Sequence, residues 1–158
     1  MSATPHSGRP QRTLTLWTPE DKEFWAREGE AIAKLNLWIS VPALFLAFAI
    51  WQVWSVVAVS LPSLGFKYST NQLFWLAAAP ALSGATLRIF YSFMVPMFGG
   101  RRWTAISTAS LLIPAIGIGY AVQDNTTGYP TMLVLALLCG LGGGNFSSSM
   151  ANISFFFP

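Results

Sequence analysis

The sequence has 158 residues, of which 53% are hydrophobic, 15% are aromatic and only 9% are charged. Ordinary soluble domains carry about 25% charged residues, so this composition excludes a disordered chain, a coiled coil and a typical soluble enzyme. The net charge of +3 is too small to indicate a nucleic-acid-binding protein, and the single cysteine excludes an intrachain disulfide. The hydrophobicity predicts an all-α membrane protein, built as a bundle of membrane helices.

Residues 1–35 differ from the rest, because they hold five of the nine basic residues and all the acidic residues except Asp124. We expect residues 1–11 to form a mobile tail, and not a signal peptide, because no apolar segment follows the early positive charges directly. Thr18 and Pro19 have the form of a helix start, with Thr18 as the cap. Apolar residues then recur among charges, which predicts a short amphipathic helix at the membrane surface. The alternative is a soluble helix that touches no lipid.

From Leu37 onward, four apolar runs are each long enough to cross a bilayer, which takes about 20 helical residues. We predict these spans at 37–61, 72–98, 103–122 and 130–157. Residues that favour turns separate the spans, including a Gly-Gly-Arg-Arg sequence after the second and an Asp-Asn-Thr-Thr-Gly sequence after the third. The chain therefore divides into a cytoplasmic tail with its amphipathic helix, 1–35, and a membrane part with four helices, 36–158.

The basic residues predict the orientation of these spans. The tail carries five of them and the second connection carries Arg101 and Arg102, whereas the first connection has only Lys67 and the third has none. By the positive-inside rule, the N-terminus and the second connection face the cytoplasm. We therefore expect a multi-pass protein of the inner (plasma) membrane.

Arg88 is the only charged residue that we place deep within the spans. Its insertion costs at least about 2.5–3.5 kcal/mol, and no acidic residue at depth pairs with it. Because a guanidinium is planar and permanently charged, it suits a planar oxyanion, and we interpret Arg88 as an anion site. The alternative is that its side chain snorkels to the membrane surface, about 15 Å away along the helix. The lack of an intramembrane carboxylate or histidine favours anion exchange over proton symport.

The fourth span contains a glycine-rich stretch, Gly140 to Gly144, followed by polar residues. The stretch lacks the Lys-Ser/Thr sequence of a phosphate-binding loop. We interpret it as a surface for close helix packing, with Gly140 and Gly144 as a small-xxx-small pair. Asn145, Ser149 and Asn152 share one helical face and are candidates for lining a pathway.

Three stretches of the chain resemble a known family. The first stretch consists of Arg88 and YSFMVPMFGGRRWT, residues 91–104. It is similar to the second span and following loop of the nitrate/nitrite porters, which are members of the major facilitator superfamily. GNFSSSMANISFFFP, residues 144–158, is similar to the end of their fourth span, and NLWISVP, residues 36–42, resembles part of their first. The resemblance begins at about Trp17 and is strongest toward the nitrite-extruding, nitrate-importing branch.

The resemblance implies a site at which one arginine from each half of a twelve-helix fold clamps a planar anion between aromatic rings. Arg88 takes the place of the first arginine and Phe146 that of one ring, so we predict that both bind nitrate or nitrite. Gly100, Arg101 and Arg102 resemble the cytoplasmic gating loop of the superfamily. Because the chain carries four of twelve spans, we interpret it as an N-terminal segment of a porter.

The resulting hypothesis is a segment of a nitrate/nitrite transporter that works by antiport and alternating access, which needs two halves. Its expected partners are nitrate, nitrite, the lipid bilayer and the remaining helices of the porter. We expect no cofactor, no metal, no nucleic-acid partner and no enzymatic activity, because the spans offer no Ser/His/Asp set or Cys/His pair. The alternative hypothesis is a four-helix membrane remnant that acts as an anchor or an interaction partner.

Overall fold

The computed structural model describes residues 17–158, so the predicted mobile tail, 1–11, lies outside the described residues. The elements are α1 (Lys22–Phe24), the π-helix η1 (Trp25–Gly29), α2 (Glu30–Ser60), α3 (Thr70–Phe98), α4 (Gly100–Ser110), α5 (Leu112–Ala121) and α6 (Tyr129–Phe156). Within this part of the chain, four helical runs are long and apolar enough to cross a membrane: Lys22–Ser60, Thr70–Phe98, Gly100–Ala121 and Tyr129–Phe156. These findings confirm the predicted all-α membrane fold.

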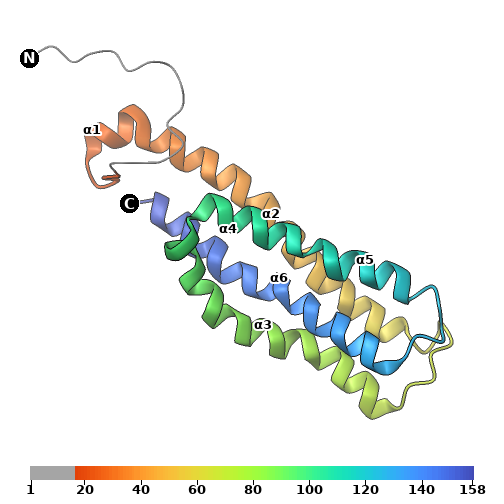
Figure 1. Cartoon of the computed structure of the whole chain (residues 1–158). Coiled ribbons are helices and arrows are strands. Elements are labelled where there is room, and N and C mark those ends of the chain that lie inside the picture. The colour runs from red at the N-terminus through yellow and green to blue at the C-terminus, as the bar shows by residue number, and fades with distance from the viewer. Residues whose placement is uncertain (1–16) are drawn as a thin grey trace, which may run out of the picture.

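Helix α6 lies at the centre of the bundle (Figure 1). It packs most extensively against α3, then against α2, and also along α4 and α5. The C-terminus lies at the same end of the bundle as α1, and the α2–α3 and α5–α6 connections lie together at the other end (Figure 1). Side chains on three sides of α6 therefore face other helices, and this helix contributes more buried residues than any other.

The predicted amphipathic helix is continuous with the first span. Helical backbone runs from Lys22 to Ser60 through the π-helical turn, with no loop at residue 35. At 1.5 Å per residue, its 39 residues extend about 58 Å, which is about twice the hydrocarbon thickness of a bilayer. Only part of this helix therefore fits within a membrane. The predicted division at residue 35 marks a change in the charge pattern of the sequence, and the helix continues across it.

The predicted cap, Thr18, is wrong: Asp21 caps this helix instead. Asp21 Oδ1 accepts hydrogen bonds from the backbone N–H of Glu23 at 2.9 Å and of Phe24 at 3.5 Å. Thr18 instead opens a turn, in which its carbonyl accepts a hydrogen bond from the Asp21 N–H at 3.1 Å. Pro19 favours that turn because its ring fixes φ. A carboxylate is also well suited to the positive end of a helix.

The connection between α3 and α4 consists of Gly99 alone. Its φ of +81° lies in the region that glycine adopts without steric cost. Gly100, Arg101 and Arg102, which we expected in a loop, therefore lie in the first turn of α4.

The third predicted span is interrupted at Leu111, between α4 and α5. Pro114 follows three residues later, and because it has no N–H it cannot donate to the carbonyl of Ser110. This missing hydrogen bond accounts for the break. Despite the break, α4 and α5 together form one candidate span, Gly100–Ala121.

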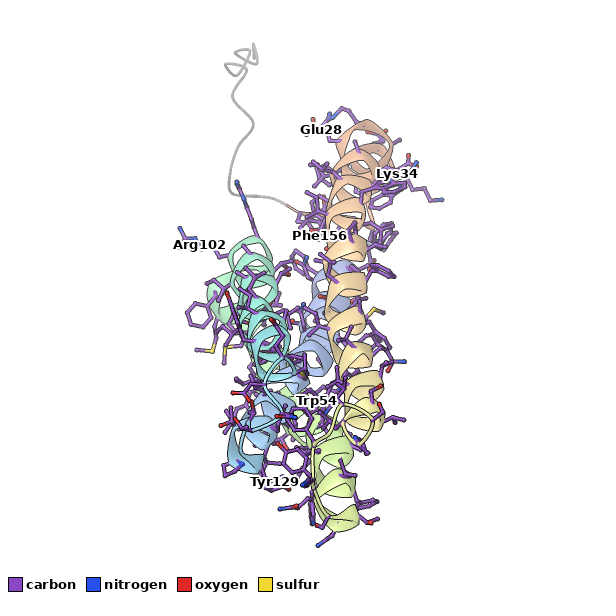
Figure 2. The ribbon with its side chains drawn as sticks, turned by 90° about the vertical axis from the view of Figure 1, so that its right-hand side faces the viewer. Glu28, Lys34, Trp54, Arg102, Tyr129 and Phe156 are labelled. Atoms are coloured by element: carbon purple, nitrogen blue, oxygen red, sulfur yellow. The ribbon has the colours of Figure 1, made fainter. Side chains whose placement is uncertain are left out.

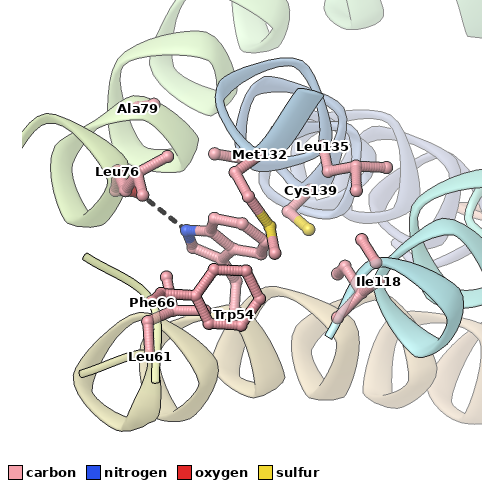
Figure 3. Packing of buried hydrophobic residues seen from close by; sticks show 11 residues of the cluster. Trp54, Leu61, Phe66, Leu76, Ala79, Ile118, Met132, Leu135 and Cys139 are labelled. Carbon is pink, nitrogen blue, oxygen red and sulfur yellow. Dashed lines mark hydrogen bonds between the residues drawn. The ribbon is translucent and has the colours of Figure 1, made fainter. Parts of the chain in front are cut away.

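An apolar cluster surrounds Trp54 (Figure 3). Trp54 lies six residues before the end of α2, and so near the α2–α3 connection. The Trp54 ring is fully buried, and its indole N–H donates a hydrogen bond to the Leu76 carbonyl at 2.7 Å. This carbonyl lacks its usual helical donor because Pro80, four residues later, has no N–H. The cluster also includes Leu61, Phe66, Ala79, Ile118, Met132, Leu135 and Cys139. Trp54 therefore both fills the core and satisfies a carbonyl that a helix-interior proline leaves free.

The two connections at this end are tied together. The Tyr68 hydroxyl donates to the Thr127 carbonyl at 2.5 Å. In the same turn, the Asp124 carboxylate accepts hydrogen bonds from the Thr126 hydroxyl and backbone N–H, which lower the pKa of this carboxyl. These contacts fix the ends of α2, α3, α5 and α6 relative to one another.

Candidate anion-binding site

The charged side chains of residues 17–158 gather at the two ends of the bundle, with one exception. Residues 20–34 and the basic pair of α4 lie at one end, as the labels of Glu28, Lys34 and Arg102 show (Figure 2). The ion pairs of the described chain are Arg27–Glu28 at 3.3 Å and Lys34–Glu30 at 2.7 Å, both near the start of the helix. Arg88 lies between the two ends, ten residues before the end of α3, and belongs to neither pair.

The Arg88 side chain points across the bundle toward α6. Its Nε–H donates to the Gly143 carbonyl at 3.2 Å, and the side chain is half-buried. This direction argues against the alternative in which Arg88 extends along α3 to the membrane surface. The terminal N–H groups of the guanidinium form no hydrogen bond with any residue in 17–158. A permanent charge and four N–H donors therefore remain for a ligand.

Aromatic rings from two helices surround this guanidinium. Its Cζ lies 5.7 Å from the centroid of Phe146 on α6 and 5.9 Å from that of Trp51 on α2. Phe48 packs edge-on against both rings, at 5.6 Å from Trp51 and 6.4 Å from Phe146. Cations within about 6 Å of a ring centroid are attracted by the ring quadrupole. The structure thus brings together Arg88 and Phe146, which the sequence predicts, with Trp51, which the sequence by itself does not single out.

Glycines make this meeting of three helices possible. A Cβ on Gly140 would lie 2.7 Å from the backbone nitrogen of Gly84, and one on Gly143 would lie 3.3 Å from the Gly84 Cα. A Cβ on Gly142 would collide with the Ala47 carbonyl of α2. The predicted close packing of the glycine stretch is therefore confirmed. Because Gly84 lies one turn before Arg88, its contact with α6 brings Arg88 alongside Gly143.

The predicted polar face of α6 is buried between helices. Asn145, Ser149 and Asn152 are each at most 4% exposed. Asn145 Oδ1 accepts a hydrogen bond from the Ser107 hydroxyl of α4 at 2.9 Å, and Asn152 Nδ2 donates to Asn36 Oδ1 of α2 at 3.1 Å. The Asn145 amide nitrogen and the Ser149 hydroxyl are buried without a partner in the described chain. These residues join α6 to α2 and α4, and their role in lining a pathway stays a prediction.

Of the three predicted gating residues, Arg101 lines a groove. This groove has a volume of about 1130 Å³, runs between α2 and α4–α5, and has mainly apolar walls that include Arg101 and Asn152. Gly100 lies so close to Asn152 that a Cβ there would collide with its amide. Arg102 is exposed. The structure therefore places Gly100 and Arg101, but not Arg102, beside the buried polar face of α6. The gating role of all three residues stays a prediction.

The described residues therefore form a set of candidate membrane helices, and Arg88 lies within one of them without an acidic partner among residues 17–158. No family model matches the chain. Over 145 residues, or 92% of its length, it is 55% identical to the nitrate/nitrite transporter NarU of Salmonella typhimurium and 56% identical to NarU of Escherichia coli. It is 48% identical over the same share to the probable nitrate/nitrite antiporter NarK2 of Thermus thermophilus.

The chain therefore belongs to the nitrate/nitrite porter family, as its motifs predicted. It spans about a third of the length of the curated relatives that it matches, 31% for each NarU. These relatives are transporters and not enzymes.

Proposed function

We propose that the chain forms four spans of a nitrate/nitrite transporter, and that Arg88 binds the planar anion within the membrane. The observation that carries this proposal is the Arg88 guanidinium, which has no acidic partner in residues 17–158 and keeps its terminal N–H groups free. An intramembrane charge is costly and by default indicates a functional site. The names of the relatives specify nitrate and nitrite as the transported ions.

The geometry around Arg88 suits a small flat oxyanion. Because the Arg88 Nε–H already donates a hydrogen bond to the Gly143 carbonyl, the guanidinium is held at one edge. Its four remaining N–H donors keep the fixed planar geometry of the group. Such charge-assisted hydrogen bonds are stronger where water is scarce. The Phe146 ring offers a flat surface against which a planar anion can lie.

The described spans also favour exchange of one anion for another. Nitrate and nitrite carry the same charge, so each can replace the other on a single arginine without a proton. Between residues 37 and 158 the only acidic residue is Asp124, which lies in the connection before α6. Proton coupling usually depends on a titratable group inside the membrane. We therefore propose antiport by alternating access, with the second half of the site supplied by further helices of the porter.

The charge distribution supports a cytoplasmic N-terminus in the inner (plasma) membrane. One end of the bundle carries the eight charged residues of 20–34 and also the basic pair Arg101 and Arg102 of α4, whereas the connections at the other end carry one basic residue, Lys67. Figure 2 labels Glu28, Lys34 and Arg102 at the first of these ends. Arg9 and Arg12, which add two further basic residues to this part of the sequence, lie outside the described residues. By the positive-inside rule, this end faces the cytoplasm.

Replacement of Arg88 by Lys in the transporter that carries this segment tests the proposal. Lysine keeps the charge but loses the fork, so we expect the apparent affinity for nitrate to fall roughly ten- to hundredfold. Uptake is measured in membrane vesicles loaded with nitrite, without a pH gradient, and normalised to the amount of protein. Arg27→Lys, which changes an exposed residue at the bundle end, is the matched control.

Normal uptake by Arg88→Lys would contradict the anion-binding role. Normal uptake by Arg88→Leu as well, with better membrane insertion, would instead support the non-transporting remnant. If uptake by the unmodified transporter needs a pH gradient and not internal nitrite, antiport is wrong.

A further inference from the structure

Trp51 is the second ring beside the candidate site, and it comes from a different helix from Phe146. The centroid distances from Arg88 Cζ are nearly equal, 5.9 Å for Trp51 and 5.7 Å for Phe146. Phe146 is carried by α6 and Trp51 by α2. Arg88 itself belongs to α3, so three helices contribute one side chain each to this group.

A comparison with Trp54, one turn further along α2, shows that Trp51 is not explained by the core. Trp54 is fully buried, and its N–H is bonded to Leu76. Trp51 is half-buried and forms no side-chain hydrogen bond with any residue in 17–158. Its side chain lies outside the apolar cluster and beside an intramembrane cation. Trp54 stabilises the bundle, whereas Trp51 is placed to act on Arg88.

Trp51 and Arg88 meet at the same glycine. The Gly143 carbonyl accepts the Arg88 Nε–H, and a Cβ built on Gly143 would lie 3.8 Å from two atoms of the six-membered ring of Trp51. The ring thus lies over the residue that holds the guanidinium. Phe48, one turn earlier on α2, packs edge-on against the ring and limits its movement. These contacts restrain Arg88 from the side of α2.

Neutral groups are the right support for an arginine that has to bind an anion. A carboxylate would orient the guanidinium but would also neutralise it and compete for its donors. An aromatic ring attracts the cation through its quadrupole and takes up none of the N–H groups. Within residues 17–158, Arg88 is held by one carbonyl and two rings, which leaves its positive charge available.

We propose that Trp51 is a positioning residue of the anion site. Its ring holds the Arg88 guanidinium in the binding geometry through a cation–π contact, and so sets the affinity for the planar oxyanion. This inference rests on the proposed function of Arg88 and adds to it a residue on the first span.

Four variants of the transporter that carries this segment test the role of Trp51: Trp51→Phe, Trp51→Leu, Trp38→Phe and Trp38→Leu. Trp38 lies on the same helix, is 75% exposed and makes no contact with Arg88, so it is a matched control. Initial rates of nitrate uptake are measured over a range of concentrations in vesicles and normalised to the amount of protein.

We expect Trp51→Leu to raise the KM for nitrate roughly tenfold, with a smaller change in the maximal rate, because the cation–π contact is lost. Trp51→Phe keeps a ring and should raise the KM less, roughly threefold. Both Trp38 variants should keep the original KM. A rise in KM that is partly rescued by phenylalanine is not expected from a residue with only a structural role.

An unchanged KM in Trp51→Phe and Trp51→Leu, with Arg88→Lys impaired, would overturn the role of Trp51 and leave that of Arg88 intact. If Arg88→Lys is also normal, the proposed function itself fails. Should Trp51→Leu not accumulate in the membrane, Trp51→Phe decides: a raised KM supports the positioning role, and an original KM with less protein overturns it.

Discussion

Residues 129–139 of α6 bury large apolar side chains, whereas residues 140–152 of the same helix bury glycines, amides and hydroxyls. In the first half, Met132, Leu135 and Cys139 pack into the cluster around Trp54 (Figure 3). In the second half, backbone lies against backbone at Gly140 and Gly143, and the carbonyl of Gly143 holds Arg88. One continuous helix therefore packs in two different ways.

The difference shows how a membrane helix can serve stability at one end and a binding site at the other. Helices in lipid gain little from the hydrophobic effect, so they associate through close packing and hydrogen bonds. Large side chains provide that packing but occupy the space between helices. Glycines provide it through the backbone, which lets α2, α3 and α6 approach closely enough for Trp51, Arg88 and Phe146 to meet.

The largest loss of stability is expected in the apolar half, from Trp54→Ala. This change leaves a cavity and removes the donor to the Leu76 carbonyl, so the free energy of unfolding should fall by about 3–5 kcal/mol. Thermal or denaturant unfolding in detergent measures the loss, and Trp38→Ala, at an exposed position, is the control. Equal losses in the two variants would mean that the cluster does not anchor the bundle.

In the glycine half, Gly140→Ala should cost less, about 1–3 kcal/mol, because a Cβ there meets the backbone of α3 and forces the two helices apart. Gly119→Ala is the matched control, since a Cβ at this position of α5 has no atom within 4 Å. The midpoint of thermal unfolding is compared for the two variants. A Gly140→Ala protein as stable as the control would show that close approach to α3 is not required.

Asn145→Ala should have the smallest effect, about 0.6–1.7 kcal/mol, because hydrogen bonds between membrane helices contribute little each. The change removes the acceptor of the Ser107 and Ser148 hydroxyls. The same unfolding measurement, repeated with Ser107→Ala and with both changes together, gives the coupling between the two side chains. A loss greater than that of Trp54→Ala would reverse the comparison between the halves of α6.

Much of the fold could be predicted, because hydrophobic length and turn residues are local properties of the sequence. The second and fourth spans begin within two residues of the predicted positions, and they end at Phe98 and Phe156. Predictions failed where a single residue decides the local geometry. Gly99 alone makes the connection, so Arg101 and Arg102 are helical, and the break at Leu111 depends on one hydrogen bond lost at Pro114.

From the sequence alone, we predicted a membrane protein of four spans, singled out Arg88 as the charged residue within them, and assigned the glycine stretch to close packing. These conclusions need only composition, spacing and charge. The tertiary structure decided which groups meet Arg88, because Trp51, Gly143 and Phe146 reach it from α2 and α6. The register between separate helices follows from how their surfaces fit, and no local pattern in one helix specifies it.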